Sequence, residues 1–211
     1  GWVRPVLHDV THVYSPSVQM FLNNETVYLY DLTEQILSDD SVHQGNESPP
    51  PYLAQFPGLM EELFKQAEVA GLWLHGQGYR GTASIDFLVA ALREPGARRV
   101  YSCEINARVT GATYPSILGR HYLPRGGWLM RNLEMKKPVP GIEILSLLME
   151  HGHLFYPQQE RGILPINFNP TKEGLVAKGQ FLCLGPTSAA CHDMLLKAAA
   201  DLPIDRTYVR D

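Results

Sequence analysis

The sequence has 211 residues, of which 45% are apolar and 19% charged, and its formal net charge is −4. This length and composition suffice for one substantial core, or for one core with a small appended domain, and they argue against a disordered chain. The negative charge excludes a general nucleic-acid binder, because binding to a phosphate backbone needs a basic surface.

Cysteine usage and hydropathy point to a cytoplasmic protein. The three cysteines have neither the spacing of a zinc site nor that of a disulfide framework, which favours a reducing compartment. The longest apolar runs fall far short of the roughly 20 residues that cross a membrane, so no membrane partner is expected. Residues 1–4 resemble neither a signal peptide nor an initiating Met, and we expect the chain to begin within a domain.

Extended structure is predicted at the start of the chain. Residues 2–7 include a proline that excludes a helix interior, and their neighbours are β-formers. The β-prone runs 18–22 and 27–32 are joined at Asn23-Asn24, a pair that tolerates left-handed backbone angles, and this pattern indicates a hairpin.

A loop and a helix are predicted next. Residues 38–52 are rich in Ser, Asp, Asn and Pro and have no periodicity, which predicts an exposed loop. Apolar residues recur at helical spacing over 58–74, and the run stops against Gly76 and Gly78. This pattern predicts an amphipathic helix.

The second half of the chain is predicted to contain helices and two strands. A boundary near residue 137, before Pro138-Val-Pro-Gly141, separates a first part, 1–137, from an extension, 138–211. We expect helices over 116–122, over 142–150 and after Thr187, whose hydroxyl suits an N-cap, and strands over 163–168 and 179–184.

A second hairpin, formed by 84–92 and 99–105, is the candidate site. A turn centred on Pro95 places Asp86 opposite Glu104 and Ser84 opposite Asn106. Alternation then divides the residues between two faces. The expected core face holds Ile85, Phe87, Val89, Tyr101, Cys103 and Ile105, and the polar face holds Asp86, Ser102, Glu104, Asn106 and Arg108.

Two carboxylates directly opposite each other on paired strands are destabilising unless a cation relieves them. Magnesium is a good candidate, because it binds hard oxygen ligands from carboxylates and an amide carbonyl while keeping positions for water and phosphate. Alternatively, these side chains form only the solvated face of an amphipathic hairpin, relieved by Arg108 or a nearby lysine.

Two sequence motifs resemble those of a known family. They are Tyr79-Arg-Gly-Thr-Ala-Ser-Ile-Asp-Phe-Leu-Val89 and Cys103-Glu-Ile-Asn-Ala-Arg-Val-Thr-Gly111. Together they resemble the ATP-grasp ligase superfamily, in which an Arg-Gly pair leads into an Asp-bearing strand and a Glu-x-Asn strand follows. The longer form Glu-Ile-Asn-Ala-Arg-x-Thr-Gly-x-Thr-Tyr-Pro, with Ser15-Pro-Ser-Val-Gln19 and Glu34-Gln35, is most similar to the peptide ligases of the pheganomycin type.

The resemblance implies an α+β fold: the ATP-grasp C-terminal subdomain, with an antiparallel sheet flanked by helices and a small α/β C-terminal extension. It implies that Asp86, Glu104 and Asn106 hold two Mg²⁺ ions on ATP. The implied reaction transfers the γ-phosphoryl group to a carboxylate, and an amine of an amino acid or peptide then attacks the acylphosphate. Arg108, and less directly Arg80, would contact phosphate oxygens, although Arg108 could instead pair with a carboxylate.

The sequence departs from the family pattern in three places. No N-terminal half with a Gly-rich loop and phosphate-binding lysines precedes Gly1, so we expect that half as a partner and an isolated chain that is inactive. Val3-Arg4-Pro5-Val6 stands where many members place an acidic residue that meets adenine, and Ser84 stands where D-alanyl-D-alanine ligase has an Arg. The second hypothesis is therefore a non-catalytic binding or assembly module of ATP-grasp shape.

Other motifs have structural interpretations. Gly76-Gln-Gly-Tyr-Arg-Gly81 spells GxGxxG, but it follows a predicted helix and enters a strand, which is the reverse of a dinucleotide site. The histidines at 8, 12, 151 and 153 have no third ligand at a suggestive spacing, so surface or hydrogen-bonded roles are expected. Cys191 is expected to be a small buried residue.

Overall fold

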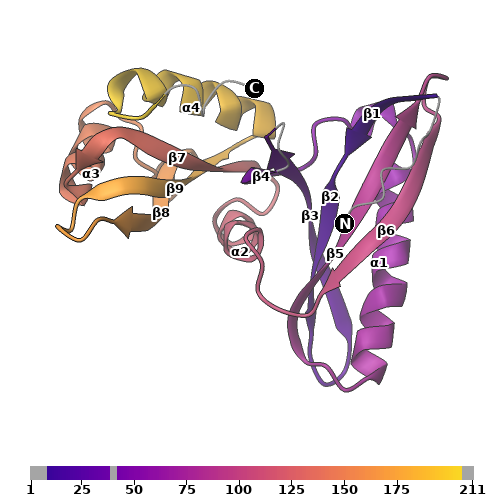
Figure 1. The fold of residues 1–211 in the computed structure, drawn as a ribbon. Coiled ribbons are helices and arrows are strands. Elements are labelled where there is room, and N and C mark those ends of the chain that lie inside the picture. Colours follow the sequence, from indigo (N-terminus) through magenta and orange to yellow (C-terminus); the bar gives the residue numbers. More distant parts are fainter. Residues whose placement is uncertain (1–8, 39–41, 206–211) are drawn as a thin grey trace. The chain divides into compact units, whose positions relative to one another are not determined.

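The protein was analysed as a computed structural model, which describes residues 9–38 and 42–205 (Figure 1). The predicted strand over 2–7 and His8 lie outside these residues. The chain divides into two compact units. Unit 1 comprises residues 1–34 and 52–110, and unit 2 comprises 35–51 and 111–211.

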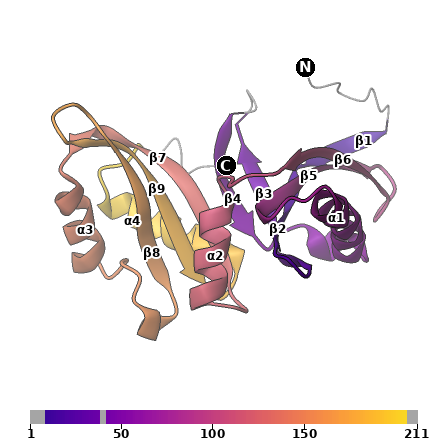
Figure 2. The same cartoon turned by 90° about the horizontal axis from the view of Figure 1, so that it is seen from below.

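Unit 1 is an antiparallel sheet with one long helix. Its elements are β1 (Val10–Tyr14), β2 (Pro16–Leu22), β3 (Val27–Leu37, whose last residues belong to unit 2), η1 (Leu53–Gln55), α1 (Leu59–Gly76), β5 (Gly81–Leu92) and β6 (Arg98–Asn106). The central strand β5 pairs with β6 along one edge and with β2 and then β1 along the other, while β3 pairs with β2. All of these pairings are antiparallel (Figures 1 and 2).

Helix α1 covers one face of this sheet, as its apolar spacing predicts. Leu59, Leu63, Ala67, Ala70 and Leu74 are buried at intervals of about one helical turn. They belong to one core cluster with sheet residues that include Val18, Met20, Leu22, Ala83, Ile85, Phe87 and Val89. The opposite face of the same strands is consequently free to carry polar side chains.

The predicted first hairpin is confirmed as β2 and β3. The Asn23 side chain accepts hydrogen bonds from the backbone N–H groups of Glu25 and Thr26, both at 2.8 Å. This local pairing explains why an Asn suits the turn, because its short amide replaces a backbone acceptor there.

Unit 2 consists of antiparallel strands with helices on both faces. Its elements are β4 (His43–Ser48), α2 (Thr113–Tyr122), β7 (Gly127–Val139), α3 (Gly141–Glu150), η2 (Pro157–Gln159), β8 (Gly162–Pro170), β9 (Val176–Gly185) and α4 (Ser188–Asp201). The strand order is β4-β7-β9-β8. Residues of α3 and α4 share a core cluster with Leu129 and Leu133 of β7, whereas Leu118 of α2 packs with Trp128 and Met130 on the other face.

The predicted exposed loop over 38–52 is wrong, because it contains strand β4, in which residues 45–48 are buried. Its polar side chains have partners within unit 2: His43 bonds Asn46 at 2.7 Å, His192 bonds Glu47 at 2.9 Å, and Arg120 donates to Ser48 at 2.8 Å. Composition suggested a loop, but pairing with β7 provides the partners that permit polar residues to be buried.

The predicted boundary near residue 137 lies inside β7, a strand that the sequence analysis did not identify. The compact units separate after Thr110 instead, and residues 35–51 join the second unit. The predicted helices and strands of this half are all present, and Thr187 caps α4 by accepting a bond from the Ala190 N–H at 3.1 Å. Among the described residues, no helix has the length and apolar character needed to cross a membrane.

Candidate metal and nucleotide site

The register of the β5–β6 hairpin is the predicted one at the candidate site. Asp86 pairs with Glu104, and Ser84 pairs with Asn106. Directly paired residues point to the same face of a sheet, so the two carboxylates lie on one face, with Cβ atoms about 5 Å apart. This is the face opposite α1.

A bulge shifts the pairing by one residue between Asp86 and Phe87, so Phe87 pairs with Ser102. Because side chains alternate with a period of two, the extra residue in β6 exchanges its two faces beyond this point. The predicted faces are therefore wrong nearer the turn. Ser102 points towards α1 and donates to Gln66 at 2.9 Å, whereas Tyr101 and Cys103 are exposed rather than in the core. Ile105, also predicted in the core, is exposed as well, although the bulge does not change its face.

The site extends across four strands of unit 1. Two rows of directly paired polar residues cross β3, β2, β5 and β6: Thr33, Ser17, Asp86 and Glu104 form the first row, and Asp31, Gln19, Ser84 and Asn106 form the second. Six of the eight are buried, Asp86 is half-buried and Glu104 is exposed. Ser17 and Gln19 belong to a segment that carries the family resemblance, but the sequence alone does not place them at this site, because their neighbours depend on strand order.

Hydrogen bonds hold the Asp86 carboxylate from two sides. Ser17 Oγ donates to Oδ1 at 2.6 Å, and Asn106 Nδ2 donates to Oδ2 at 3.1 Å. Gln19 Nε2 in turn donates to Ser17 Oγ at 2.9 Å, and Thr110 Oγ1 contacts Gln19 Oε1 at 3.4 Å. The carboxylate is therefore oriented by both neighbouring strands before any ligand binds.

The donor set fits a hard cation. Because the Asn106 amide nitrogen donates to Asp86, the Asn106 carbonyl oxygen is left as a possible ligand. Within residues 9–38 and 42–205, no hydrogen bond or ion pair occupies the Glu104 carboxylate, and the buried Ser84 hydroxyl has no partner. Two carboxylates and one amide oxygen match the ligands of magnesium, which completes its shell with water and phosphate.

Only two of these three residues are acidic, and the described part of the chain contains no cluster of three or more His, Cys, Asp or Glu side chains arranged for a metal ion. A site of this kind would therefore depend on oxygen atoms from the nucleotide. The metal-binding roles of Asp86, Glu104 and Asn106 remain predictions.

The charge of Asp86 affects the neighbouring thiol. The pKa of Cys103 is raised above its ordinary value by partial burial first and by the Asp86 carboxylate second, with a backbone hydrogen bond opposing them. Both causes disfavour the thiolate. Cys103 thus lies close enough to Asp86 to report on its charge.

The two predicted phosphate-binding arginines make other contacts in the structure. Arg108 lies beyond the end of β6, is exposed, and donates to the Val109 carbonyl at 3.3 Å. Arg80 is exposed and donates to the His75 and Tyr79 carbonyls, at 3.0 and 2.7 Å, at the C-terminal end of α1. Their roles at a phosphate group stay predictions.

The structural interpretations of the other motifs are confirmed where the structure describes them. The GxGxxG segment is the end of α1 followed by a turn, with Gly78 at φ 86° and Gly81 at φ 124°. His151 and His153 approach the same carboxylate oxygen of Asp201, at 3.8 and 2.8 Å. Cys191 is buried, and burial raises its pKa to about 12.

Comparisons with known proteins support the ATP-grasp resemblance. No protein-family model matches the chain. It is 30% identical over 104 residues to the [butirosin acyl-carrier protein]–L-glutamate ligase of Niallia circulans, a match that covers 49% of this chain and 23% of that protein.

Solved structures share the fold at low sequence identity. Biotin carboxylase of Campylobacter jejuni, in a complex with a form of ATP, matches with a TM-score of 0.61 and 11% identity over 93% of this chain and 47% of the enzyme. N5-carboxyaminoimidazole ribonucleotide synthetase of Thermus thermophilus matches with a TM-score of 0.56 and 19% identity over 96% of this chain and 52% of that protein.

The chain thus has the antiparallel α+β fold of the ATP-grasp enzymes, as its sequence motifs predicted. It spans about half the length of these two solved structures.

Proposed function

We propose that this chain is the C-terminal, magnesium- and ATP-binding half of an ATP-dependent carboxylate–amine ligase. The observation that carries this proposal is the direct pairing of Asp86 with Glu104, with Asn106 bonded to Asp86, on the sheet face opposite α1. Two like charges paired at this position destabilise the sheet in the absence of a ligand, and a bound cation would remove this repulsion.

The proposed reaction forms an amide in two steps. A carboxylate oxygen attacks the γ-phosphorus of ATP. The bond between this phosphorus and the oxygen that bridges it to the β-phosphorus breaks, and the products are ADP and an acylphosphate. An amine then attacks the acyl carbon, loses a proton and expels inorganic phosphate. The similarity to the acyl-carrier-protein–L-glutamate ligase supports a carboxylate substrate and an amine substrate, with an amino acid or a peptide among them.

The residues of the chain would act mainly by position and charge. Glu104 and Asp86 would hold the metal ions, and the Asn106 carbonyl would complete the protein ligands; Ser17 would keep Asp86 oriented through its 2.6 Å bond. Two Mg²⁺ ions, when bound, would neutralise charge on the β- and γ-phosphates. Arg108 is the proposed side chain for phosphate oxygens, since a guanidinium binds them in a forked geometry.

Calorimetry of ATP binding in the presence and absence of Mg²⁺ tests this proposal. We expect the chain to bind ATP only with Mg²⁺, and Asp86→Asn to abolish this Mg²⁺-dependent binding, whereas Glu94→Gln in the exposed hairpin turn should change nothing. The measurement should include the longest protein in which this chain is encoded. Absence of magnesium-dependent binding in both forms would refute the proposal.

The alternative is a non-catalytic binding or assembly module of the same fold. The low identity to the two solved enzymes, 11% and 19%, is compatible with it, because a shared fold does not by itself imply a shared function. Retained Mg²⁺–ATP binding without any ATP turnover in the longest protein, at any carboxylate and amine tested, would support this second function.

A further inference from the structure

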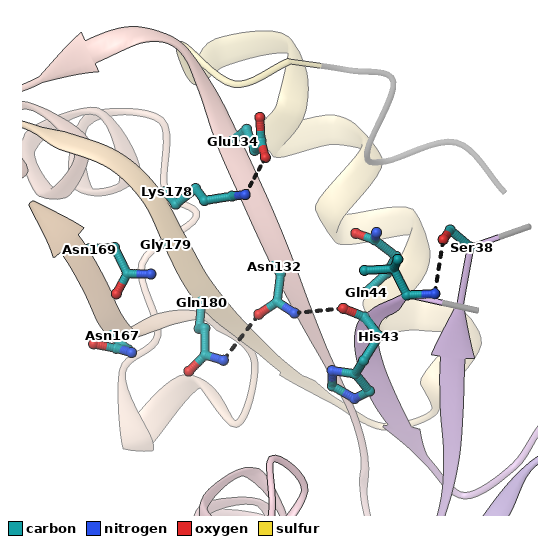
Figure 3. Close-up of a pocket in the computed structure, with 11 residues that line it drawn as sticks. Ser38, His43, Gln44, Asn132, Glu134, Asn167, Asn169, Lys178, Gly179 and Gln180 are labelled. Atoms are coloured by element: carbon teal, nitrogen blue, oxygen red, sulfur yellow. Dashed lines mark hydrogen bonds and ion pairs between the residues drawn. The ribbon is translucent and has the colours of Figure 1, made fainter. Parts of the chain in front are cut away.

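Unit 2 contains a polar cavity that the proposed ligase chemistry does not use. Its volume is about 550 Å³, within the range of small-ligand sites. The described lining residues all belong to unit 2: they come from the start of β4, from β7, β8 and β9, and from Ser38 and Val42 outside the strands (Figure 3).

The floor of the cavity is an ordered array of side chains on three strands. Asn132, Gln180 and Asn167 form one row across β7, β9 and β8, because each is directly paired with the next. Glu134, Lys178 and Asn169 form the adjacent row in the same way. Rows separated by two residues along a strand lie roughly 7 Å apart.

The first row is held in place by its own hydrogen bonds. Gln180 Nε2 donates to Asn132 Oδ1 at 3.0 Å, and Asn132 Nδ2 donates to the His43 carbonyl at 3.3 Å (Figure 3). These bonds direct the amides without using all of their capacity, since Gln180 Oε1 remains as an acceptor. In the part of the chain that the structure describes, nothing pairs with the carboxamides of Asn167 and Asn169.

Two charged side chains of the cavity pair with each other. Lys178 Nζ lies 2.5 Å from Glu134 Oε1, and these are the two charged side chains among the lining residues that the structure describes. A phosphate or an isolated carboxylate would have to compete with Glu134 for Lys178. Among the described lining residues, the imidazole of His43 is the one aromatic ring, and no Phe, Tyr or Trp side chain offers a larger platform for a base or a sugar ring.

We propose that this cavity binds an extended, uncharged chain of secondary amides. Each carboxamide of the floor offers both N–H donors and a carbonyl acceptor, so it can pair with either end of a peptide group. Successive rows about 7 Å apart match the two-residue repeat of an extended peptide. A peptide main chain and a pantetheine arm both present such amides, and this inference rests on the cavity alone, not on the magnesium site.

Nuclear magnetic resonance can observe the relevant groups directly, because each Asn and Gln side chain gives its own NH₂ signals. The ¹⁵N-labelled chain would be titrated separately with acetyl-triglycine-amide, pantetheine, maltotriose and inorganic phosphate. We expect saturable shifts of the side-chain NH₂ signals of Asn167, Asn169 and Gln180 with one or both amide probes. The probe that binds more tightly identifies the source of the amides.

Asn167→Asp is the informative variant. It keeps the shape of the side chain but replaces its two N–H donors with an acceptor, and Asn167 is exposed, so folding should be unaffected. Loss of one neutral hydrogen bond should weaken binding about three- to tenfold. The matched control, Gln158→Glu, makes the same carboxamide-to-carboxylate change at an exposed position of η2 outside the cavity and should leave the affinity unchanged.

Three results would overturn the inference. They are an absence of shifts at these NH₂ groups with both amide probes, equal affinity of the Asn167→Asp and control variants, and tighter binding of maltotriose or phosphate at the same signals. Unchanged backbone spectra of the two variants establish that the comparison is between folded proteins.

Discussion

Glu104→Gln is the most direct test of why two acids face each other on β5 and β6. In the metal-free protein this change removes a like-charge pair between directly opposed strand residues, and we expect its cost to be of the same size as favourable cross-strand pairs, about 0.2–1 kcal/mol. Glu104 is exposed, so solvent screening places the expected gain near the middle of that range, about 0.5 kcal/mol. The variant should therefore be slightly more stable than the natural chain when Mg²⁺ is chelated.

Bound ligand should reverse this order. At a ligand concentration ten times the dissociation constant, binding stabilises the folded state by about 1.4 kcal/mol. The natural chain should gain about this much from Mg²⁺ and ATP, and Glu104→Gln should gain little because one ligand is lost.

Hydrogen exchange of the backbone amides of β5 and β6 is the suitable assay, because it reports local opening free energy in a chain of two compact units. Exchange would be measured with chelator and with Mg²⁺–ATP. Glu94→Gln makes the same charge change in the exposed turn of this hairpin and serves as the control. Destabilisation of metal-free Glu104→Gln, or an undiminished effect of Mg²⁺–ATP on it, would show that the paired carboxylates do not exist to hold a cation.

Three further changes test the surroundings of the site and the packing of unit 2. Ser17→Ala removes the donor to Asp86 Oδ1 and should lower the local opening free energy of the β2–β5 pairing by about 1.5 kcal/mol; a loss under about 0.5 kcal/mol in hydrogen exchange would contradict the bond's role. Asp86→Asn removes a charge that raises the pKa of Cys103, so more thiolate is present at pH 8 and alkylation by iodoacetamide should be several-fold faster; an unchanged rate would contradict this. Gly119→Ala places a Cβ 2.4 Å from Cδ1 of Trp128, and thermal unfolding followed by tryptophan fluorescence should show destabilisation of about 1–3 kcal/mol despite the better helix propensity of Ala; unchanged stability would mean that the helix shifts freely.

The sequence by itself determined the elements whose signals are local. Apolar residues at helical spacing predicted α1, and the Asn23-Asn24 pair predicted the β2–β3 turn that the Asn23 side chain closes. The hairpin register was also predictable at Asp86 and Glu104, because a short turn limits which residues can face each other. The motifs that resemble the ATP-grasp ligases then gave these paired acids a chemical interpretation as metal ligands.

Only the tertiary structure decided the features that depend on distant partners. The bulge after Asp86 exchanged the faces of β6 near the turn, because one extra residue reverses a two-residue alternation. Strand β4 was hidden by its polar composition, since His192 and Arg120, which satisfy Glu47 and Ser48, lie far along the chain.

Strand order also decided which side chains meet at the candidate metal site of unit 1 and on the cavity floor of unit 2. Ser17 meets Asp86 only because β2 lies beside β5, and Asn132, Gln180 and Asn167 form a row only because β7, β9 and β8 are adjacent. Spacing along the chain specifies which side of a strand a residue occupies. The neighbours on that side are set by strand order, which depends on how apolar faces of distant segments pack together.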